Sequence, residues 1–179
     1  LLKYDQQRDI PSEHATSGLS PYLAVGSVSV RQCLRAVLDT LGDKAEAQLM
    51  QGGLNHAGAS CWVNELIWRD YYQYLMFHFN DLSKSKPFKS DTQWLPWRTG
   101  TEADRDFDAW CAGRTGYPII DAAMRQLNQT GWMHNRLRMI AASFLTKLLL
   151  TNWRRGEDYF MDKLSDGEFA SNNGGWQWS

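Results

Sequence analysis

Apolar residues recur at helical spacing along most of the chain, and no stretch alternates between apolar and polar residues as a half-buried strand does. The clearest helix is predicted over residues 29–41, with Ser27 or Ser29 as its N-cap. Spacings of three and four residues place its apolar side chains on one core-facing stripe. That stripe consists of Val30, Cys33, Leu34, Val37, Leu38 and Leu41.

The middle of the chain predicts a weak helix, a strong helix and a long loop. Residues 42–59 are rich in small and polar side chains and would end in a flexible connection through Gly52, Gly53 and Gly58. Residues 60–79 form the strong helix, with Ser60 as N-cap. Three lysines and two prolines then break the pattern between residues 80 and 100, which predicts an irregular surface loop.

Four more helices are predicted over residues 104–111, 118–131, 133–150 and 153–164. Pro118 suits the first turn of the second of these helices, and Gly131 stops it. The third would turn six apolar residues inward: Leu137, Ile140, Ala141, Phe144, Leu145 and Leu148. The predicted fold is all-α, a cluster of helices joined by sizeable loops.

Composition limits the classes of protein to consider. A chain of 179 residues is long enough for one domain with a real core, and 43% hydrophobic residues exclude global disorder. Nine tryptophans exceed ordinary packing needs, which indicates an aromatic ligand, stacking or electron transfer. The net charge of −1 gives no case for a polyanionic partner, so any such case depends on local clustering.

Cysteines and histidines argue against disulfide and metal chemistry. Three cysteines without CxxC spacing are typical of reduced thiols in an intracellular protein. Four scattered histidines lack the spacing of metal ligands. No run of about 18 apolar residues predicts a membrane span. The chain starts at a leucine, so targeting cannot be judged from this end.

The segment 166–179 concentrates acids, paired amides, paired glycines and two tryptophans. Its amides donate and accept hydrogen bonds, and its glycines let backbone approach a flat group closely. Trp176 and Trp178 are two residues apart and cannot share one helix face, so one is expected to point inward and the other toward a partner. This segment is a candidate site.

A second candidate is the predicted helix from Ser60. Trp62, Glu65, Arg69 and Tyr72 share one face of it. A solvated face with a Glu65–Arg69 ion pair is the simpler interpretation. The aromatic residues that flank these charges favour the wall of a cavity for something flat and polar.

Two further features carry possible chemistry. Arg138 has apolar helical neighbours and needs a carboxylate partner, for which Asp166 is the candidate. Arg136 points elsewhere, and a merely exposed first turn remains an alternative for it. Residues 15–23 supply hydroxyls and a glycine that could meet a phosphate, although such turns usually cap helices, and this one is not a P-loop.

Five segments together resemble the DNA photolyases and cryptochromes, and most closely the class I cyclobutane pyrimidine dimer photolyases. They are TSGLSP at 16–21, WVNELIWR at 62–69, GRTGYPIIDAAMRQL at 113–127, GWMHNRLRM at 131–139 and DGEFASNNGGWQW at 166–178. The resemblance implies that residues 1–179 form the greater part of a helical domain that binds FAD and DNA lesions. An N-terminal α/β antenna domain and the final helices would lie outside this chain, which is expected to be a fragment.

The resemblance also implies the residues that contact FAD. Tyr4, Thr16, Ser17, Leu19 and Ser20 would hold its phosphates and ribityl chain. Trp62, Glu65 and Arg69 would line the cavity, Arg138 and Asp166 would lie beside the isoalloxazine ring, and Asn172 would face N5. Glu168 stands where many relatives have Asp. The resemblance allows an antenna chromophore of folate or deazaflavin type in the full-length protein, and this fragment would not bind it.

For the substrate, the resemblance implies that Trp68 and Trp178 sandwich a flipped-out pyrimidine dimer. Glu65 would hydrogen-bond a carbonyl of the dimer and stabilise charge on its radical anion, while Tyr72, Asn135 and Met139 would complete the pocket. Arg136 would bind a backbone phosphate near the lesion.

Trp97, Trp153 and Trp176 resemble the chain of tryptophans that photoreduces oxidised flavin in this family. Trp176 would be innermost and Trp97 outermost, with Trp94 as a rival for the outer place.

The implied activity is that of a deoxyribodipyrimidine photo-lyase, in which light drives an electron from reduced FAD to the dimer. The protein would act as a cytoplasmic monomer on damaged DNA, without a membrane or a metal. One alternative is a cryptochrome photoreceptor on the same fold, and another is a non-catalytic helical scaffold. The segment from Gly131 lacks the histidine pair expected of a (6-4) photolyase.

Overall fold

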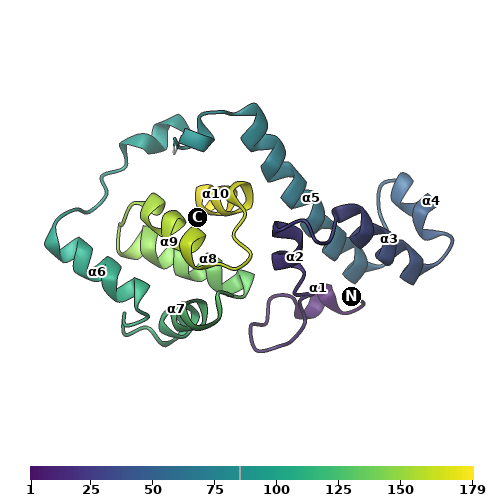
Figure 1. Cartoon of the computed structure of the whole chain (residues 1–179), viewed down its shortest axis with the longest axis horizontal. Helices are drawn as coiled ribbons and strands as arrows, with labels where there is room; N and C mark the ends of the chain where they lie inside the picture. The colour runs from purple at the N-terminus through teal and green to yellow at the C-terminus, as the bar shows by residue number, and fades with distance from the viewer. Residues whose placement is uncertain (85) are drawn as a thin grey trace. The chain divides into compact units, whose positions relative to one another are not determined.

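The computed structural model describes residues 1–84 and 86–179, which divide into two compact units, Leu1–Tyr71 and Tyr72–Ser179. Both are built from helices, and the described residues contain no strand (Figure 1). The all-α prediction is therefore confirmed, whereas the single-domain organisation stays a prediction. No helix within the two described ranges is long and apolar enough to cross a membrane.

The first unit contains α1 (Tyr4–Gln7), α2 (Ser20–Ala24), α3 (Val30–Leu41), α4 (Ala45–Met50) and the start of α5 (Ala57–His78). Ser29 caps α3 through a capping box with Gln32, which confirms one of the two predicted caps. The predicted stripe of α3 packs as expected. The buried core is Cys33, Val37, Ala45, Leu54, Ala59, Trp62, Val63 and Leu66.

The start of α5 corrects the prediction that Ser60 caps this helix and that Gly58 lies in a flexible connection. The helix begins at Ala57, and the His56 side chain accepts a hydrogen bond from the backbone N–H of Ala59 at 3.3 Å. A Cβ at Gly58 would lie 2.6 Å from the carbonyl oxygen of Leu1. Gly58 is therefore a close-packing residue inside the helix.

The second unit starts with the end of α5 and continues through two short 3₁₀ helices, η1 (Leu82–Lys84) and η2 (Ser90–Trp94). It then forms α6 (Thr101–Cys111), α7 (Pro118–Thr130), α8 (Asn135–Ser143), the π-helical turn η3 (Phe144–Leu148), α9 (Trp153–Lys163) and α10 (Phe169–Trp178). Pro118 opens α7 and Gly131 ends it, as predicted, and the structure shows Gly131 in the left-handed conformation.

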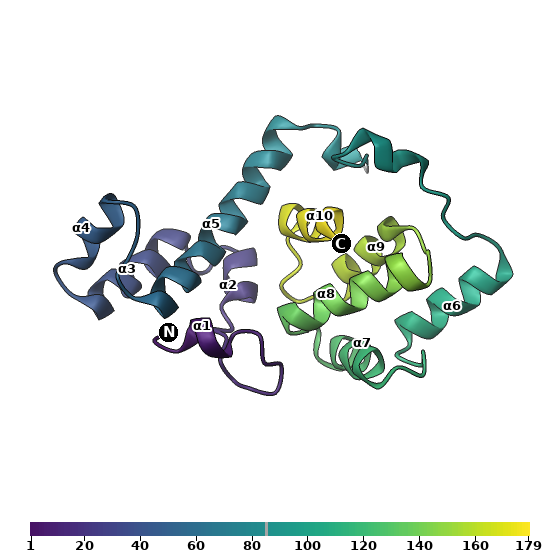
Figure 2. The same ribbon diagram turned by 180° about the vertical axis from the view of Figure 1, so that it is seen from behind.

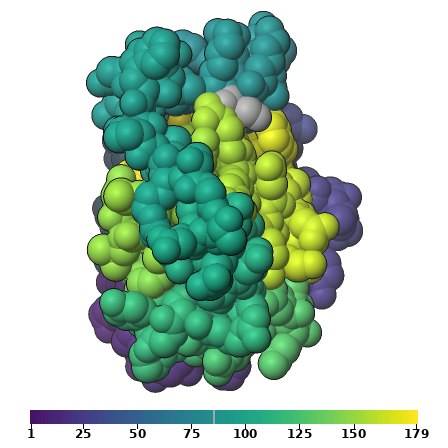
Figure 3. Space-filling view, turned by 90° about the vertical axis from the view of Figure 1, so that its left-hand side faces the viewer, coloured from purple at the N-terminus to yellow at the C-terminus, as the bar shows by residue number. Residues whose placement is uncertain are grey.

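Packing in the second unit joins α7 to α8 and α9 to α10 (Figures 1 and 2). Arg155 of α9 pairs with Asp104 of α6 at 2.8 Å, which joins α6 to the same group. In the space-filling view of Figure 3, α6 (teal) lies in front of the yellow-green surface of α9. The buried core is Trp110, Ile120, Ala123, Met124, Leu127, Met133, Ala141, Ala142, Phe144, Leu145, Trp153, Phe160, Leu164 and Trp176.

The long helix predicted over 133–150 is wrong in length. The His134 side chain accepts from the backbone N–H of Arg136 and caps a nine-residue α8. Beyond it the Leu149 N–H bonds to the Phe144 carbonyl, five residues back, which is a π turn. The wider turn changes the facing of the side chains, so Leu148 is 64% exposed instead of inward.

The segment 166–178 contains a helix that the sequence pattern did not predict. The Glu168 carboxylate accepts from the N–H groups of Ala170 and Ser171 and caps α10. Trp176 is 3% exposed and Trp178 is 69% exposed. The expectation that one tryptophan points inward and the other outward is confirmed.

Candidate functional site

The predicted site residues divide between the two units, and each group is described within its own unit. In the first unit, the carboxylate of Glu65 lies 2.5 Å from the guanidinium of Arg8, which also donates to Cys61 Sγ at 3.1 Å. Arg8 lies over the ring of Tyr4 at 5.3 Å. Burial, with the charge of Glu65, raises the pKa of the Tyr4 hydroxyl to about 12. These contacts form a half-buried polar cluster around one carboxylate.

The contact of Arg8 with Glu65 was not predicted from the sequence. Arg8 is 57 positions from Glu65, and α1 is a short helix without a buried side chain, so no local pattern marks it. The simple interpretation of Glu65 as an i,i+4 partner of Arg69 does not describe the ion pair found, since Glu65 meets Arg8. Arg69 donates to the carbonyl of Leu23 at 3.4 Å.

The aromatic residues of this part of α5 differ in exposure. Trp62 is 9% exposed and packs in the core of the first unit. Trp68 is 53% exposed and meets Tyr71 edge-on, with ring centroids 5.6 Å apart. Trp62 therefore anchors the helix, whereas Trp68 presents an indole face to solvent.

The turn before α2 presents polar groups. Thr16 is half-buried, Ser17 and Ser20 are exposed, and Gly18 has a φ of +65° that suits glycine. Across residues 1–84 and 86–179, no hydrogen bond engages the three hydroxyls. They are available to an external acceptor such as a phosphate oxygen. Leu19 and Tyr4 pack against the core behind them.

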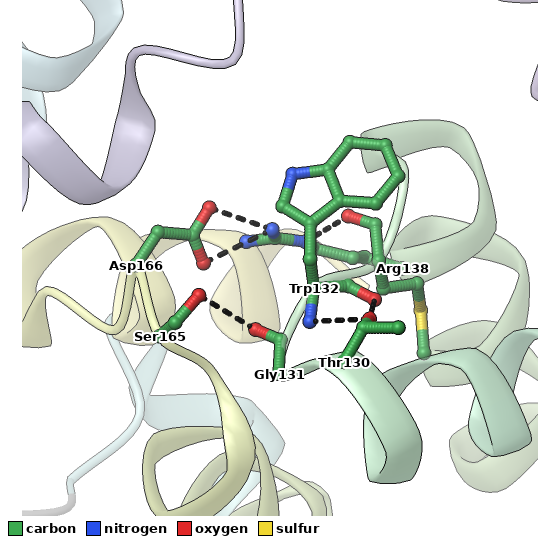
Figure 4. Close-up of polar contacts among 7 residues, drawn as sticks. Thr130, Gly131, Trp132, Arg138, Ser165 and Asp166 are labelled. Atoms are coloured by element: carbon green, nitrogen blue, oxygen red, sulfur yellow. Dashed lines mark hydrogen bonds and ion pairs between the residues drawn. The ribbon is translucent and has the colours of Figure 1, made fainter.

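In the second unit, Arg138 and Asp166 form the ion pair that the sequence predicted (Figure 4). Arg138 Nη2 lies 3.0 and 2.8 Å from the two carboxylate oxygens, and Nε donates to the Met133 carbonyl at 2.8 Å. The Asp166 side chain is 2% exposed. Ser165 donates to the Gly131 carbonyl from its backbone and its side chain, which fixes the loop before α10 to the end of α7.

Elsewhere in the second unit, α9 and α10 share a polar contact. Asn172 Nδ2 donates to the backbone carbonyl of Glu157 at 3.0 Å, so the amide orientation is fixed and its oxygen remains as an acceptor. Asn173 Nδ2 donates to the Glu157 carboxylate at 2.6 Å. Burial raises the pKa of Glu157.

Glu157 was not singled out from sequence, whereas Asn173 was noted there only as one of the paired amides of segment 166–179. Glu157 is four residues after Trp153 and three before Phe160, which places an acid on the buried stripe of α9. That position was a usable signal, because an acid on an apolar stripe requires a buried partner.

The predicted tryptophan chain lies around the core of the second unit. Trp153 and Trp176 are buried in it, and Trp97 packs against it partly buried. Trp94 is 80% exposed. A Cβ on Gly156 would lie 2.1 Å from the Trp176 ring, so Trp176 rests on α9 one turn after Trp153.

An open, mainly apolar groove of about 570 Å³ brings together three of the predicted substrate residues, Arg136, Met139 and Trp178. Arg136 Nη1 lies 3.7 Å from the sulfur of Met139. Two other predicted residues do not line this groove. Asn135 is exposed at the first position of α8, and the ring of Tyr72 lies where a side chain on Gly174 would be.

The family model described as the FAD binding domain of DNA photolyase matches residues 62–179. The chain belongs to the DNA photolyase family. It is similar to the deoxyribodipyrimidine photo-lyase of Vibrio cholerae, with 52% identity over 98% of this chain and 35% of that protein. The resemblance inferred from the five segments is thereby confirmed.

Two solved structures extend the comparison. A class III photolyase from Agrobacterium tumefaciens is 41% identical with a TM-score of 0.85, over 98% of this chain and 34% of that one. A cryptochrome from Synechocystis is 31% identical with a TM-score of 0.79, over the same shares. The chain spans about a third of the length of these relatives.

Proposed function

We propose that the protein containing this chain repairs cyclobutane pyrimidine dimers in DNA with light, using FAD. The observation that carries the proposal is the 52% identity to a deoxyribodipyrimidine photo-lyase across almost the whole chain. When bound, reduced FAD would supply one electron to the dimer on absorbing light.

The donor and acceptor groups of the chain fit this cofactor. The hydroxyls of Thr16, Ser17 and Ser20 suit phosphate oxygens. In the second unit, the guanidinium of the Arg138–Asp166 pair can donate hydrogen bonds and the amide oxygen of Asn172 can accept them. Both kinds of group suit the polar edge of the isoalloxazine ring. We assign the remaining cofactor contacts to Tyr4, Leu19, Trp62, Glu65 and Arg69.

Glu168 is the N-cap of α10. Its two carboxylate oxygens accept from two backbone N–H groups at the start of α10. We propose that it acts on FAD by holding α10, and with it Asn172, in place, since its oxygens are already engaged.

Glu65 is proposed to act on the dimer. Its carboxylate already accepts from the Arg8 guanidinium and can accept further hydrogen bonds, so we propose a contact with a pyrimidine N–H in place of the carbonyl contact that the resemblance implied. Arg8 fixes the orientation of this carboxylate. Trp68 and Trp178 offer exposed indole faces for stacking, and Arg136, Met139, Asn135 and Tyr72 are assigned to the surrounding DNA and lesion contacts.

Repair is tested with the full-length protein loaded with FAD, chemically reduced and illuminated with an oligonucleotide that contains one thymine dimer. Restoration of the two thymines in light, and none in the dark, is the expected result. An absence of restored thymines in light would overturn the proposal.

A photoreceptor is the second candidate, because the Synechocystis cryptochrome shares the fold. It predicts FAD loading and light-dependent absorbance changes without any restored thymine. The same samples therefore separate the two functions.

A further inference from the structure

Two consecutive arginines at the start of α9 each lie over an aromatic ring. The guanidinium carbon of Arg154 is 4.7 Å from the ring centroid of Trp153, and that of Arg155 is 4.0 Å from the ring centroid of Phe107. Arg155 also pairs with Asp104 at 2.8 Å. Both guanidinium groups thus lie over a ring at a similar distance, but Arg154 lies over a tryptophan of the proposed electron-transfer chain and Arg155 over a phenylalanine outside it.

Trp153 occupies the middle of the proposed tryptophan chain. On one side, Gly156 lets the Trp176 ring approach α9 one turn after Trp153. On the other, Arg98 bonds to the carbonyls of Leu149 and Leu150, so the backbone next to Trp97 lies against the segment that leads into Trp153. Trp153 itself is 8% exposed.

A cation over an indole face is attracted to the neutral ring but repels a ring that has lost an electron. The repulsion is stronger inside a protein than in water, because the effective dielectric constant is lower. We propose that Arg154 destabilises the oxidised state of Trp153, so that the positive charge passes on to Trp97. This inference rests on the proposed function, within which oxidised Trp176 takes an electron from Trp153.

Each step moves one electron and breaks no bond. Trp153 gives an electron to oxidised Trp176, and Trp97 then gives one to oxidised Trp153. An external thiolate gives one electron to oxidised Trp97 and becomes a thiyl radical. With Arg154 present, Trp153 is a brief intermediate, and the separated charge rests farther from the cofactor.

The test is flash spectroscopy of tryptophan-radical signals in the full-length, FAD-loaded protein. Arg154→Met should let the charge rest on Trp153, so the radical signal should decay about tenfold faster by charge return, a change of ~1.4 kcal/mol in the relevant equilibrium. Arg154→Lys keeps the charge and should stay close to wild type. Arg155→Met is the matched control and should leave the decay unchanged.

Packing is checked separately by near-ultraviolet circular dichroism of each variant without FAD, which should match wild type. An Arg154→Met decay equal to wild type, or an Arg154→Lys decay as fast as that of Arg154→Met, would overturn the inference. Trp153→Phe tests separately whether the proposed tryptophan electron-transfer chain operates at all. The radical signal of this variant should be lost, and an unchanged signal would remove the chain and the inference together.

Discussion

Arg138 and Asp166 show how a single buried charge constrains this molecule. The Asp166 side chain is almost fully buried, and the two oxygens face one guanidinium nitrogen at 2.8 and 3.0 Å. Such a pair contributes little net stability compared with apolar residues, but removing one partner leaves an uncompensated charge. Comparing the free energy of unfolding of a single variant with that of the double variant therefore measures how strongly each charge depends on its partner.

Arg138→Met should lower the free energy of unfolding by about 3–5 kcal/mol, because Asp166 would stay buried without its partner. Arg138→Met combined with Asp166→Leu should cost clearly less. Urea unfolding of the full-length protein measures both. Arg35→Ala, which removes an exposed partner of Asp39, is the control and should cost at most about 0.5 kcal/mol. A double variant as unstable as the single one would contradict the assignment.

Glu157 is a buried acid whose contribution to the free energy of unfolding should depend on pH. Burial raises its pKa in the folded protein, so between the ordinary and the raised pKa the folded state binds more protons than the unfolded state. The free energy of unfolding should therefore fall as pH rises through that window. Glu157→Gln keeps an acceptor for Asn173 and removes the titration.

Urea midpoints measured across a pH series test this expectation. The difference between Glu157→Gln and wild type should grow in favour of the variant as pH rises above the range of an ordinary glutamate. A difference that is constant with pH would show that Glu157 does not titrate abnormally.

The residue-scale predictions from sequence succeeded where a local conflict was visible. Arg138 among apolar neighbours required a carboxylate, and Asp166 was found in that role. Glu157 on the stripe of α9 carried the same kind of signal but was overlooked. Arg8 could not be found, because its contact with Glu65 depends on how α1 packs against α5 and not on any local spacing.

At the scale of elements, boundaries set by strong local signals were predicted well. Ser29 with Gln32 begins α3, and Gly131 ends α7 in a conformation that glycine adopts readily. Boundaries set by packing were not. The glycine at 58 is inside α5 because the chain near Leu1 crosses there, and paired glycines concealed α10.

Two helical glycines provide a matched test of this distinction. Gly156→Ala gains up to ~1 kcal/mol of helix propensity but forces a Cβ to within 2.1 Å of Trp176, and overpacking costs about 1–3 kcal/mol. It should be destabilising overall. Gly175→Ala meets no atom within 4 Å and should gain about 0.5–1 kcal/mol. Thermal unfolding compares them, and equal effects would contradict the packing described.

At the scale of the whole molecule, 19 basic and 20 acidic residues give no overall field that attracts DNA. The proposed DNA binding would then depend on local contacts, and Arg136 in the groove with Met139 and Trp178 is the proposed phosphate contact.

Arg136→Ala should weaken DNA binding and reduce the slope of log affinity against log salt concentration by about 0.9 for one lost phosphate contact. Arg31→Ala, on the exposed face of α3, should leave the slope unchanged. Titration of labelled duplex at several salt concentrations measures it, and an unaltered slope for Arg136→Ala would place this residue away from phosphate.

The most direct measurement presents two lesions to the reduced, illuminated full-length protein, a cyclobutane thymine dimer and a (6-4) photoproduct, and quantifies restored thymine by chromatography. Restoration is expected from the cyclobutane dimer alone. Restoration from the (6-4) photoproduct, or from neither lesion, would contradict it.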